Sequence, residues 1–305
     1  MAGHIVVVGS LNMDLVVKTP RHPKVGETIL GSEFRTYPGG KGANQAVAAA
    51  KLGCPVKMVG RVGNDPFANE LLEAISIETF DTEYIIRDPN EPTGVAFITV
   101  DQDGHNSIVV APGANAHVSP EDVQAAENVF IGAAVLLVQL ECPLPAVVRA
   151  IDLAKKHQLH VVLNPAPGQV LGSDLLGKVD YLLPNESELA LISGEQEMSS
   201  AIDKMRELGA GALVITMGSE GVLVVDQTSE LQIPALDVKV VDTTAAGDAF
   251  AGAFAVALTE GYELYDAARW GTIAGALAVT RSGAQPSLPS RAKFNRLLQE
   301  HQRDS

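Results

Sequence analysis

The chain has 305 residues, of which 46% are hydrophobic and 19% charged, and its formal net charge is −15. This length is enough for one large core with a small appendage, and the composition is typical of a soluble globular protein. Because so much negative charge repels nucleic acids and anionic membranes, we expect neither as a partner.

Several features of the sequence favour a cytoplasmic location. The two cysteines, Cys54 and Cys142, cannot make a disulfide framework, so we expect both to be reduced, and no Cys/His cluster has metal-ligand spacing. No apolar run approaches the ~18 residues of a membrane span. The N-terminus enters a strand-like run at residues 5–8 and lacks the basic region and cleavage site of a signal peptide.

The predicted elements alternate between strands and helices along the chain. Short β-branched runs predict buried strands at residues 5–8, 56–62, 135–140, 161–163, 181–183 and 213–216. Helical spacing of apolar residues predicts helices at 44–52, 66–75, 121–130, 146–157 and 201–208. This alternation predicts an α/β fold with a mostly parallel central sheet covered on both faces, in one domain over 1–305. Ligands of such sheets bind outside the carboxyl ends of the strands.

Two segments depart from the alternation. Residues 15–38 contain prolines, glycines and short extended runs, without a long helix. Residues 93–100 and 105–111 are extended runs joined by 101–104 (DQDG), which predicts a hairpin. These pieces form either a small sheet that projects from the main domain or edge strands of the central sheet.

The common phosphate-binding glycine motifs do not match. In the P-loop pattern, Gly40-Lys41 would need Ser or Thr next but is followed by Gly42, and Arg35 stands where the first glycine belongs. The first predicted strand is followed by a single glycine, Gly9, so the dinucleotide fingerprint is absent. Protein-kinase signatures are absent as well.

One motif near the C-terminus has the chemistry of a phosphoryl-transfer site. Residues 242–250 (DTTAAGDAF) precede a long apolar stretch of small residues. Small residues before a helix let backbone N–H groups approach an anion, and the helix dipole favours negative charge there. Asp248 could then accept a proton from a hydroxyl beside the bound phosphate. The alternative is that Asp248 is a helix N-cap.

A second motif lies near the N-terminus. Residues 39–44 (GGKGAN) precede an apolar helical run. Three glycines at a helix start permit close backbone approach to a ligand, and Lys41 and Asn44 offer polar groups suited to sugar hydroxyls. A flexible loop before a helix is the alternative.

A third motif follows the predicted strand that ends near residue 216. Residues 216–221 (TMGSEG) form a glycine turn that could wrap a nucleotide, although an ordinary β-turn has the same composition.

A fourth motif follows the predicted strand at 181–183. Asn185 and Glu188 are three residues apart and share a helix face. Together they could hold phosphate and hydrated Mg²⁺, or they could form a capping box.

These four motifs, in this order, resemble those of the ribokinase-type carbohydrate kinases, the phosphofructokinase-B family. The resemblance covers essentially the whole chain. The two family signatures correspond to residues 39–46 (GGKGANQA) and 242–248 (DTTAAGD). The segments at 12–14, 140–141, 164–167, 184–186 and 283–287 also resemble family sequences.

The resemblance implies particular roles for particular residues. Sugar-binding positions are Asn12, Asp14, Gly40, Lys41, Asn44, Glu141 and Asp248. Nucleotide-binding positions are Asn185, Thr216, Gly218, Ser219, Gly221, Gly247 and Thr272; family members commonly have His or Asn near the adenine, where this chain has Thr272. The anion hole corresponds to Ala245, Ala246 and Gly247, and the catalytic base to Asp248. A potassium site corresponds to Asp242, Thr244, Ala278, Arg281, Gly283 and Ser287, and the magnesium region to Asn185 and Glu188.

The resemblance also implies an architecture and cofactors. It implies a β-sheet lid formed by inserted segments at about 15–38 and 93–111, a homodimer paired through that lid, ATP with Mg²⁺, and K⁺ as an activating cation. At the cation segment, Pro286 with Gly283 nearby favours an irregular turn whose carbonyl groups point inward; the alternative is that Asp242 caps a turn and Gly283 ends a helix.

The residues at the sugar end favour a neutral substrate. A sugar phosphate would need Arg or Lys there, whereas this chain offers carboxylates, an amide and one lysine. We expect ribose, phosphorylated on its terminal 5-hydroxyl, with deoxyribose as the nearest alternative. A nucleoside is less expected because no aromatic cluster surrounds residues 12–14. A sugar-binding regulator without activity is the alternative from another class.

Overall fold

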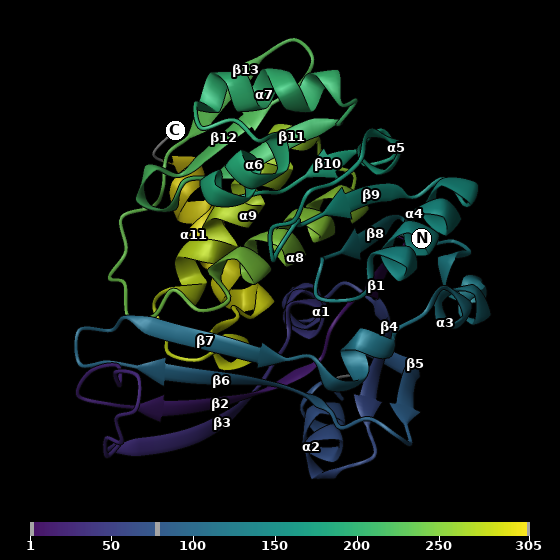
Figure 1. Ribbon diagram of the computed structural model, residues 1–305. Coiled ribbons are helices and arrows are strands. Elements are labelled where there is room, and N and C mark those ends of the chain that lie inside the picture. Colours follow the sequence, from purple (N-terminus) through teal and green to yellow (C-terminus); the bar gives the residue numbers. More distant parts are fainter. Residues whose placement is uncertain (1–2, 77–79, 304–305) are drawn as a thin grey trace.

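The computed structural model describes residues 3–76 and 80–303, which form two sheets and their covering helices (Figure 1). The larger sheet has nine strands in the order β13-β12-β11-β10-β9-β8-β1-β4-β5. They are β1 (Ile5–Val8), β4 (Val56–Gly63), β5 (Phe80–Asp88), β8 (Val135–Val138), β9 (His160–Leu163), β10 (Tyr181–Leu182), β11 (Ala212–Thr216), β12 (Val222–Val225) and β13 (Glu230–Ile233).

The smaller sheet has four strands in the order β3-β2-β6-β7. They are β2 (Asn12–Lys18), β3 (Glu33–Gly39), β6 (Gly94–Val100) and β7 (Asn106–Ala111). The main helices are α1 (Lys41–Lys51), α2 (Pro66–Ala74), α3 (Pro120–Ala125), α4 (Leu144–Lys156), α6 (Glu186–Ser193), α7 (Met198–Glu207), α8 (Ala246–Thr259), α9 (Leu264–Ala278) and α11 (Arg291–Arg303). Short helices are η1 (Gly113–His117), η2 (Glu127–Phe130), α5 (Ser173–Leu176), η3 (Gly218–Glu220) and α10 (Ala284–Ser287). No helix in the described ranges is long and apolar enough to cross a bilayer.

The predicted α/β architecture is confirmed. Strands β1, β4, β5 and β8 to β11 pair in parallel, and only β12 runs against the others, so its pairs with β11 and with the edge strand β13 are antiparallel. Alternate residues of β1 enter different cores: Ile5 and Val7 pack toward α1, α8 and α9, whereas Val6 and Val8 pack toward α3, α4 and α7. The helix expected over 121–130 is in fact divided into α3 and η2, with Ala126 between them.

Strand β1 is the point where the strand order of the large sheet changes direction. It pairs with β4 on one side and with β8 on the other. The chain segments that leave β1 and β8 therefore diverge at their carboxyl ends, which opens a crevice of the kind in which α/β sheets bind ligands. Helices α1 and α8, each of which begins in one of the two family motifs, lie side by side against β1 and β8 (Figure 1).

The smaller sheet projects from the main body (Figure 1). Strands β6 and β7 form the predicted hairpin, closed at its turn by a hydrogen bond from the Asp101 N–H to the His105 carbonyl (3.0 Å). The β2–β3 pair is also antiparallel, but β2 and β6 pair in parallel, so the sheet is mixed. Because β2 follows β1 after three residues, one run of chain passes from the interior of the large sheet into the small one.

Helices α1 and α8 approach each other unusually closely. A β-carbon at Gly252 of α8 would lie 2.6 Å from the Ala48 β-carbon and 2.8 Å from the Gln45 carbonyl oxygen of α1. Glycine at this position and alanine opposite therefore permit a separation that larger side chains would prevent. This contact brings the motifs at 39–46 and 242–248 together, although about 200 residues separate them in sequence.

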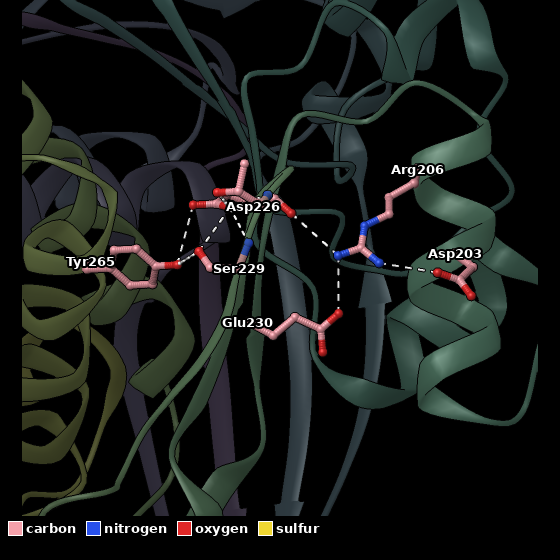
Figure 2. A network of polar contacts seen from close by, with 7 residues as sticks. Asp203, Arg206, Asp226, Ser229, Glu230 and Tyr265 are labelled. Carbon is pink, nitrogen blue, oxygen red and sulfur yellow. Dashed lines mark hydrogen bonds and ion pairs between the residues drawn. The ribbon is translucent and has the colours of Figure 1, made fainter.

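A polar network fixes the β12–β13 hairpin at the far edge of the large sheet (Figure 2). Arg206 of α7 forms ion pairs with Asp203 and with Glu230 of β13. In the turn, Asp226 accepts hydrogen bonds from the Ser229 N–H and from the Tyr265 hydroxyl of α9. The hairpin is thereby attached to helices on both sides, α7 and α9.

Candidate active site

Asp248 lies in the first turn of α8 and lines a cavity together with Lys41 and Asn185. It is the third residue of the helix, and its side chain is 7% exposed. The N-cap is Ala245, whose φ of 59° is left-handed, so the proposal that Asp248 caps the helix is wrong. Its carboxylate is directed to other partners: Oδ2 accepts from Asn44 Nδ2 (2.9 Å) and Oδ1 accepts from Gln45 Nε2 (3.0 Å).

Backbone amides surround the same helix start. The Ala246 N–H donates to the Thr243 carbonyl (3.2 Å), whereas no partner is found in the described ranges for the N–H groups of Gly247 and Asp248. Open space lies beside Gly247, because a β-carbon there would meet no atom within 4 Å. An anion can therefore reach the positive end of the α8 dipole.

The predicted sugar-binding residues are brought together around this point. Gly40 packs so closely on β2 that a β-carbon there would lie 2.6 Å from the Asn12 nitrogen. The carboxylate of Glu141 accepts from the Ser10 hydroxyl (2.5 Å) and from the Lys41 N–H (3.1 Å). Asp14 lies against Gly39, where any side chain would collide with its carboxylate.

Asp14 is an unusual carboxyl group because it is 8% exposed and no hydrogen bond to it is found in the described structure. Burial, reinforced by the charges of Glu141 and Asp248, raises the pKa of Asp14 to about 7, and Lys41 partly opposes this. An ionised carboxylate with unused lone pairs is suited to accept hydrogen bonds from sugar hydroxyl groups.

Lys41 is the positively charged residue among these acids. Burial alone would lower the pKa of Lys41, but the carboxylates of Asp248, Glu141, Glu188 and Asp14 together raise it, so the ammonium group is firmly charged. Burial raises the pKa of Glu188, and its contact with the Asn185 N–H and the charge of Lys41 lower it in part. One lysine thus faces four acids, which favours a further cation at this end of the site.

Two cavities meet at the start of α8. The smaller, of about 240 Å³, is lined by Lys41, Asn185, Glu188 and Asp248, among others. The larger, of about 670 Å³, extends away between η3, the segment after β13, and α9. Both are lined by Thr216, Thr243, Ala246, Gly247 and Phe250, so they form one continuous groove.

The larger cavity contains most of the predicted nucleotide positions. Its lining includes Thr216, Gly218, Ser219, Gly221, Gly247 and Thr272. The 216–221 turn is tight, because the Met217 N–H donates to the Gly221 carbonyl (2.8 Å) and both glycines have left-handed φ angles. Thr272 donates its hydroxyl to the Ala268 carbonyl of its own helix (2.9 Å). Apolar side chains such as Val222, Leu236 and Val279 complete walls that suit a flat aromatic base.

Asn185 and Glu188 do form a capping box at the start of α6. The Asn185 side chain accepts from the Glu188 N–H (2.8 Å), and the Glu188 Oε2 atom accepts from the Asn185 N–H (2.9 Å). Both residues also line the smaller cavity, so the structural role and a role toward a ligand are compatible.

The segments proposed for a monovalent cation also meet. Asp242 accepts hydrogen bonds from the Thr244 N–H and the Gly283 N–H, both at 2.9 Å, and its own N–H contacts the Val279 carbonyl (3.2 Å). The positions matched to the family's cation site, Asp242, Thr244, Ala278, Arg281, Gly283 and Ser287, therefore come from two segments that lie side by side.

Two predictions for the later segment were wrong. The irregular turn expected around Pro286 is the short helix α10, in which Pro286 occupies the third position, where its missing N–H costs little. Gly283 does not end a helix, because α9 ends at Ala278 and Gly283 is the N-cap of α10.

Several buried or half-buried polar residues next to the site were not predicted from the sequence. Gln45, Gln139 and Asn164 form an amide cluster behind Asp248. Asn115 bonds both backbone groups of Leu11 and the Asn12 side chain. The available signal was an amide at the carboxyl end of a predicted buried strand, because such positions face the ligand edge of the sheet. Residue 139 lies near the end of the strand predicted at 135–140, and residue 164 directly follows the strand predicted at 161–163.

Comparison with known proteins agrees with this geometry. The sequence profile of the pfkB family carbohydrate kinases matches residues 2–291. The chain is 40% identical to the ribokinase of Haemophilus influenzae over 300 residues (97% of this chain, 98% of the relative) and 37% identical to the deoxyribokinase of Salmonella typhi (96% and 98%). The structure of Arabidopsis thaliana ribokinase complexed with ribose and ATP is similar, with a TM-score of 0.91, 36% identity, and coverage of 98% of this chain and 99% of that one.

The environment of Asp14 predicts a pH-dependent stability. The unfolded chain loses this proton near the ordinary pKa of 3.8, whereas the native state keeps it up to about 7, so native stability falls as the pH rises through this interval. Asp14→Asn should therefore increase the free energy of unfolding in urea by about 2 kcal/mol more at pH 8 than at pH 5. Asp203→Asn, at an exposed aspartate, is the control. Equal gains at the two pH values would contradict the assignment.

Proposed function

The chain belongs to the pfkB family of carbohydrate kinases, and we propose that it transfers the γ-phosphoryl group of ATP to the 5-hydroxyl of D-ribose. The products are ribose 5-phosphate and ADP. The observation that carries the proposal is the Asp248 carboxylate, held by two amides at the start of α8, where the two cavities join. The relatives named above support ribose and ATP as the substrates.

In the proposed reaction, Asp248 accepts the proton of the sugar 5-hydroxyl as its oxygen attacks the γ-phosphorus. The sugar lies toward Asn12, Asp14 and Asn44, and the nucleotide occupies the larger cavity. The amides of Gly247 and Asp248 stabilise the charge that spreads over the transferred phosphoryl group. Most of the catalysis is positioning and electrostatics, so few reacting side chains are needed.

The family also implies Mg²⁺ bound with ATP, and the residues present fit this ion. Asn185 and Glu188 provide oxygen ligands at the smaller cavity, and Mg²⁺ prefers oxygen and retained water. When bound, the ion would offset the negative charge of the phosphates, which otherwise face the carboxylates around Lys41.

A monovalent cation, K⁺, is proposed beside the anion-binding turn. The proposed ligand atoms are all oxygens. In the described ranges, the carbonyl groups of Thr244 and Arg281 accept no hydrogen bond. A weakly hydrated ion suits such a set of carbonyls with one carboxylate. The ion would not touch the substrate but would hold the segment that leads into α8.

The small sheet is proposed to act as a lid and as a dimer contact. Every residue of β7 is exposed, including Ile108, Val109 and Val110, and Phe97 of β6 is half exposed. Such an apolar strip on a sheet with a free edge favours association with another molecule. A second copy of this chain is the proposed partner, and sedimentation velocity measures whether the purified protein is dimeric.

The first prediction concerns the base. Asp248→Asn should keep ATP binding but lower kcat by about 100-fold or more, because an amide cannot accept the hydroxyl proton. ATP-consumption assays with ribose measure kcat, and thermal melts with and without ATP measure folding and ATP binding. Asp203→Asn is the matched control. A near-normal kcat in a folded variant would contradict the assignment of Asp248 as the base. Absence of ATP consumption by the wild-type enzyme with any sugar would favour a non-catalytic sugar-binding protein.

The second prediction concerns the choice of sugar. The kcat/KM for ribose should exceed that for 2-deoxyribose by at least about tenfold, because a site that hydrogen-bonds a hydroxyl group discriminates against its loss. Steady-state kinetics with both sugars measure the ratio, and phosphorus NMR identifies the phosphorylated position. Equal or reversed constants would instead assign the protein to the deoxyribose kinases.

The third prediction concerns the cation. Initial rates should be higher in potassium chloride than in sodium chloride at matched ionic strength, and the effect should fall mainly on kcat rather than on ATP affinity. Asp242→Ala should remove the difference, because Asp242 links the two segments of the cation site. Indistinguishable rates of the wild-type enzyme in the two salts would refute this site.

A further inference from the structure

Gln45 lies directly behind Asp248 and is completely buried. Its side-chain amide group donates two hydrogen bonds, to Asp248 Oδ1 and to Asn164 Oδ1, both at 3.0 Å. Its carbonyl oxygen accepts from Gln139 Nε2 (2.5 Å). Both protons of the amide and its oxygen are therefore engaged, so the group has one permitted orientation.

The partners of Gln45 are themselves fixed by the large sheet. Asn164 follows β9 and donates its own amide to the Leu183 carbonyl, which follows β10 (2.9 Å). This bond turns the Asn164 oxygen toward Gln45 and so requires that Gln45 present its N–H groups. Gln139 follows β8 and fits only because Gly9, which follows β1, has no side chain.

Gln45 bonds one oxygen of Asp248, and Asn44 bonds the other. Asn164 and Asp248 line the smaller cavity, whereas Gln45 does not reach it. A residue that cannot touch the substrate acts through the residues that it bonds, and of the two that line the cavity, Asp248 is the proposed base. Hydrogen bonds donated to a carboxylate favour its ionised form and fix the direction of its remaining lone pairs.

We propose that Gln45 is the positioning residue for the catalytic base: it fixes the rotamer of Asp248 so that the free lone pairs of the carboxylate face the sugar hydroxyl. This inference rests on the proposed function. The amide cluster ties that carboxylate to the ends of β8, β9 and β10, and the base consequently has the rigidity of the sheet and not that of a loop.

The neutrality of Gln45 is as important as its hydrogen bonds. Asp248 already interacts with the charges of Lys41, Asp14 and Glu188. Asp14 and Glu188 are acids like Asp248, and only Lys41 is positively charged. Another carboxylate in contact with Asp248 would therefore favour protonation of the base. A neutral donor avoids this effect.

Two variants test the inference. Gln45→Met removes the donors without adding charge and should lower kcat by about 10- to 100-fold, with the KM values for ribose and ATP nearly unchanged. Gln45→Glu has the same shape but adds a like charge, so the acid limb of its kcat/KM profile should move to higher pH by at least about one unit. Gln124→Glu, which adds the same charge on the surface of α3, should move neither quantity.

A second measurement does not depend on turnover. The carboxyl carbon resonance of Asp248, assigned by comparison with Asp248→Asn, should titrate at higher pH in Gln45→Glu than in the wild type. If the wild-type enzyme phosphorylates ribose but both Gln45 variants keep wild-type kcat and pH profile, the positioning role is wrong. If the wild type has no sugar kinase activity, the proposed function is wrong. In that case, an Asp248 resonance that titrates at the same pH in Gln45→Glu and in the wild type would reject the Gln45 contact as well. If Gln45→Glu does not fold, the kcat and KM values of Gln45→Met decide whether Gln45 has the positioning role.

Discussion

The structure of the site depends on the close contact between α1 and α8. Helix α1 begins in the motif at 39–46 and helix α8 in the motif at 242–248, and neither motif has a complete site by itself. Gly252 and the alanines of α1 let the two helices approach until Asn44 and Gln45 reach the carboxylate of Asp248. A larger residue at position 252 would separate the base from its two amide partners, because packed helices cannot absorb an added methyl group without moving.

The second constraint is electrostatic. A chain with a net charge of −15 would repel ATP if its charge were spread evenly, so binding must depend on local groups. Backbone N–H groups at the start of α8 provide positive potential without a side chain, and Lys41 provides a full charge that the surrounding acids keep protonated. The acids in turn favour metal cations, so this acidic region is compatible with a nucleotide that arrives with its own ion.

The topology couples sugar binding to the small sheet. Strand β1 ends at the crevice, and within three residues the chain becomes β2, which carries Asn12 and Asp14 into that sheet. Asn115, just after β7, bonds Leu11 and Asn12, so both ends of the small sheet are tied to the same point. A movement of this sheet would therefore displace groups proposed to bind the sugar, and binding of the sugar would favour one position of the sheet.

The sequence by itself determined the α/β class, most element positions and the two motifs, because hydrophobic period and glycine spacing are local properties. The tertiary structure alone decided which groups meet. It placed Asp248 third in its helix, turned the expected irregular segment at Pro286 into a helix, and assembled the amide cluster of Gln45, Gln139 and Asn164. Each of these outcomes depends on contacts between residues far apart in the chain. Such contacts arise only when helices pack on the sheet, and local sequence patterns do not specify the strand order of that sheet.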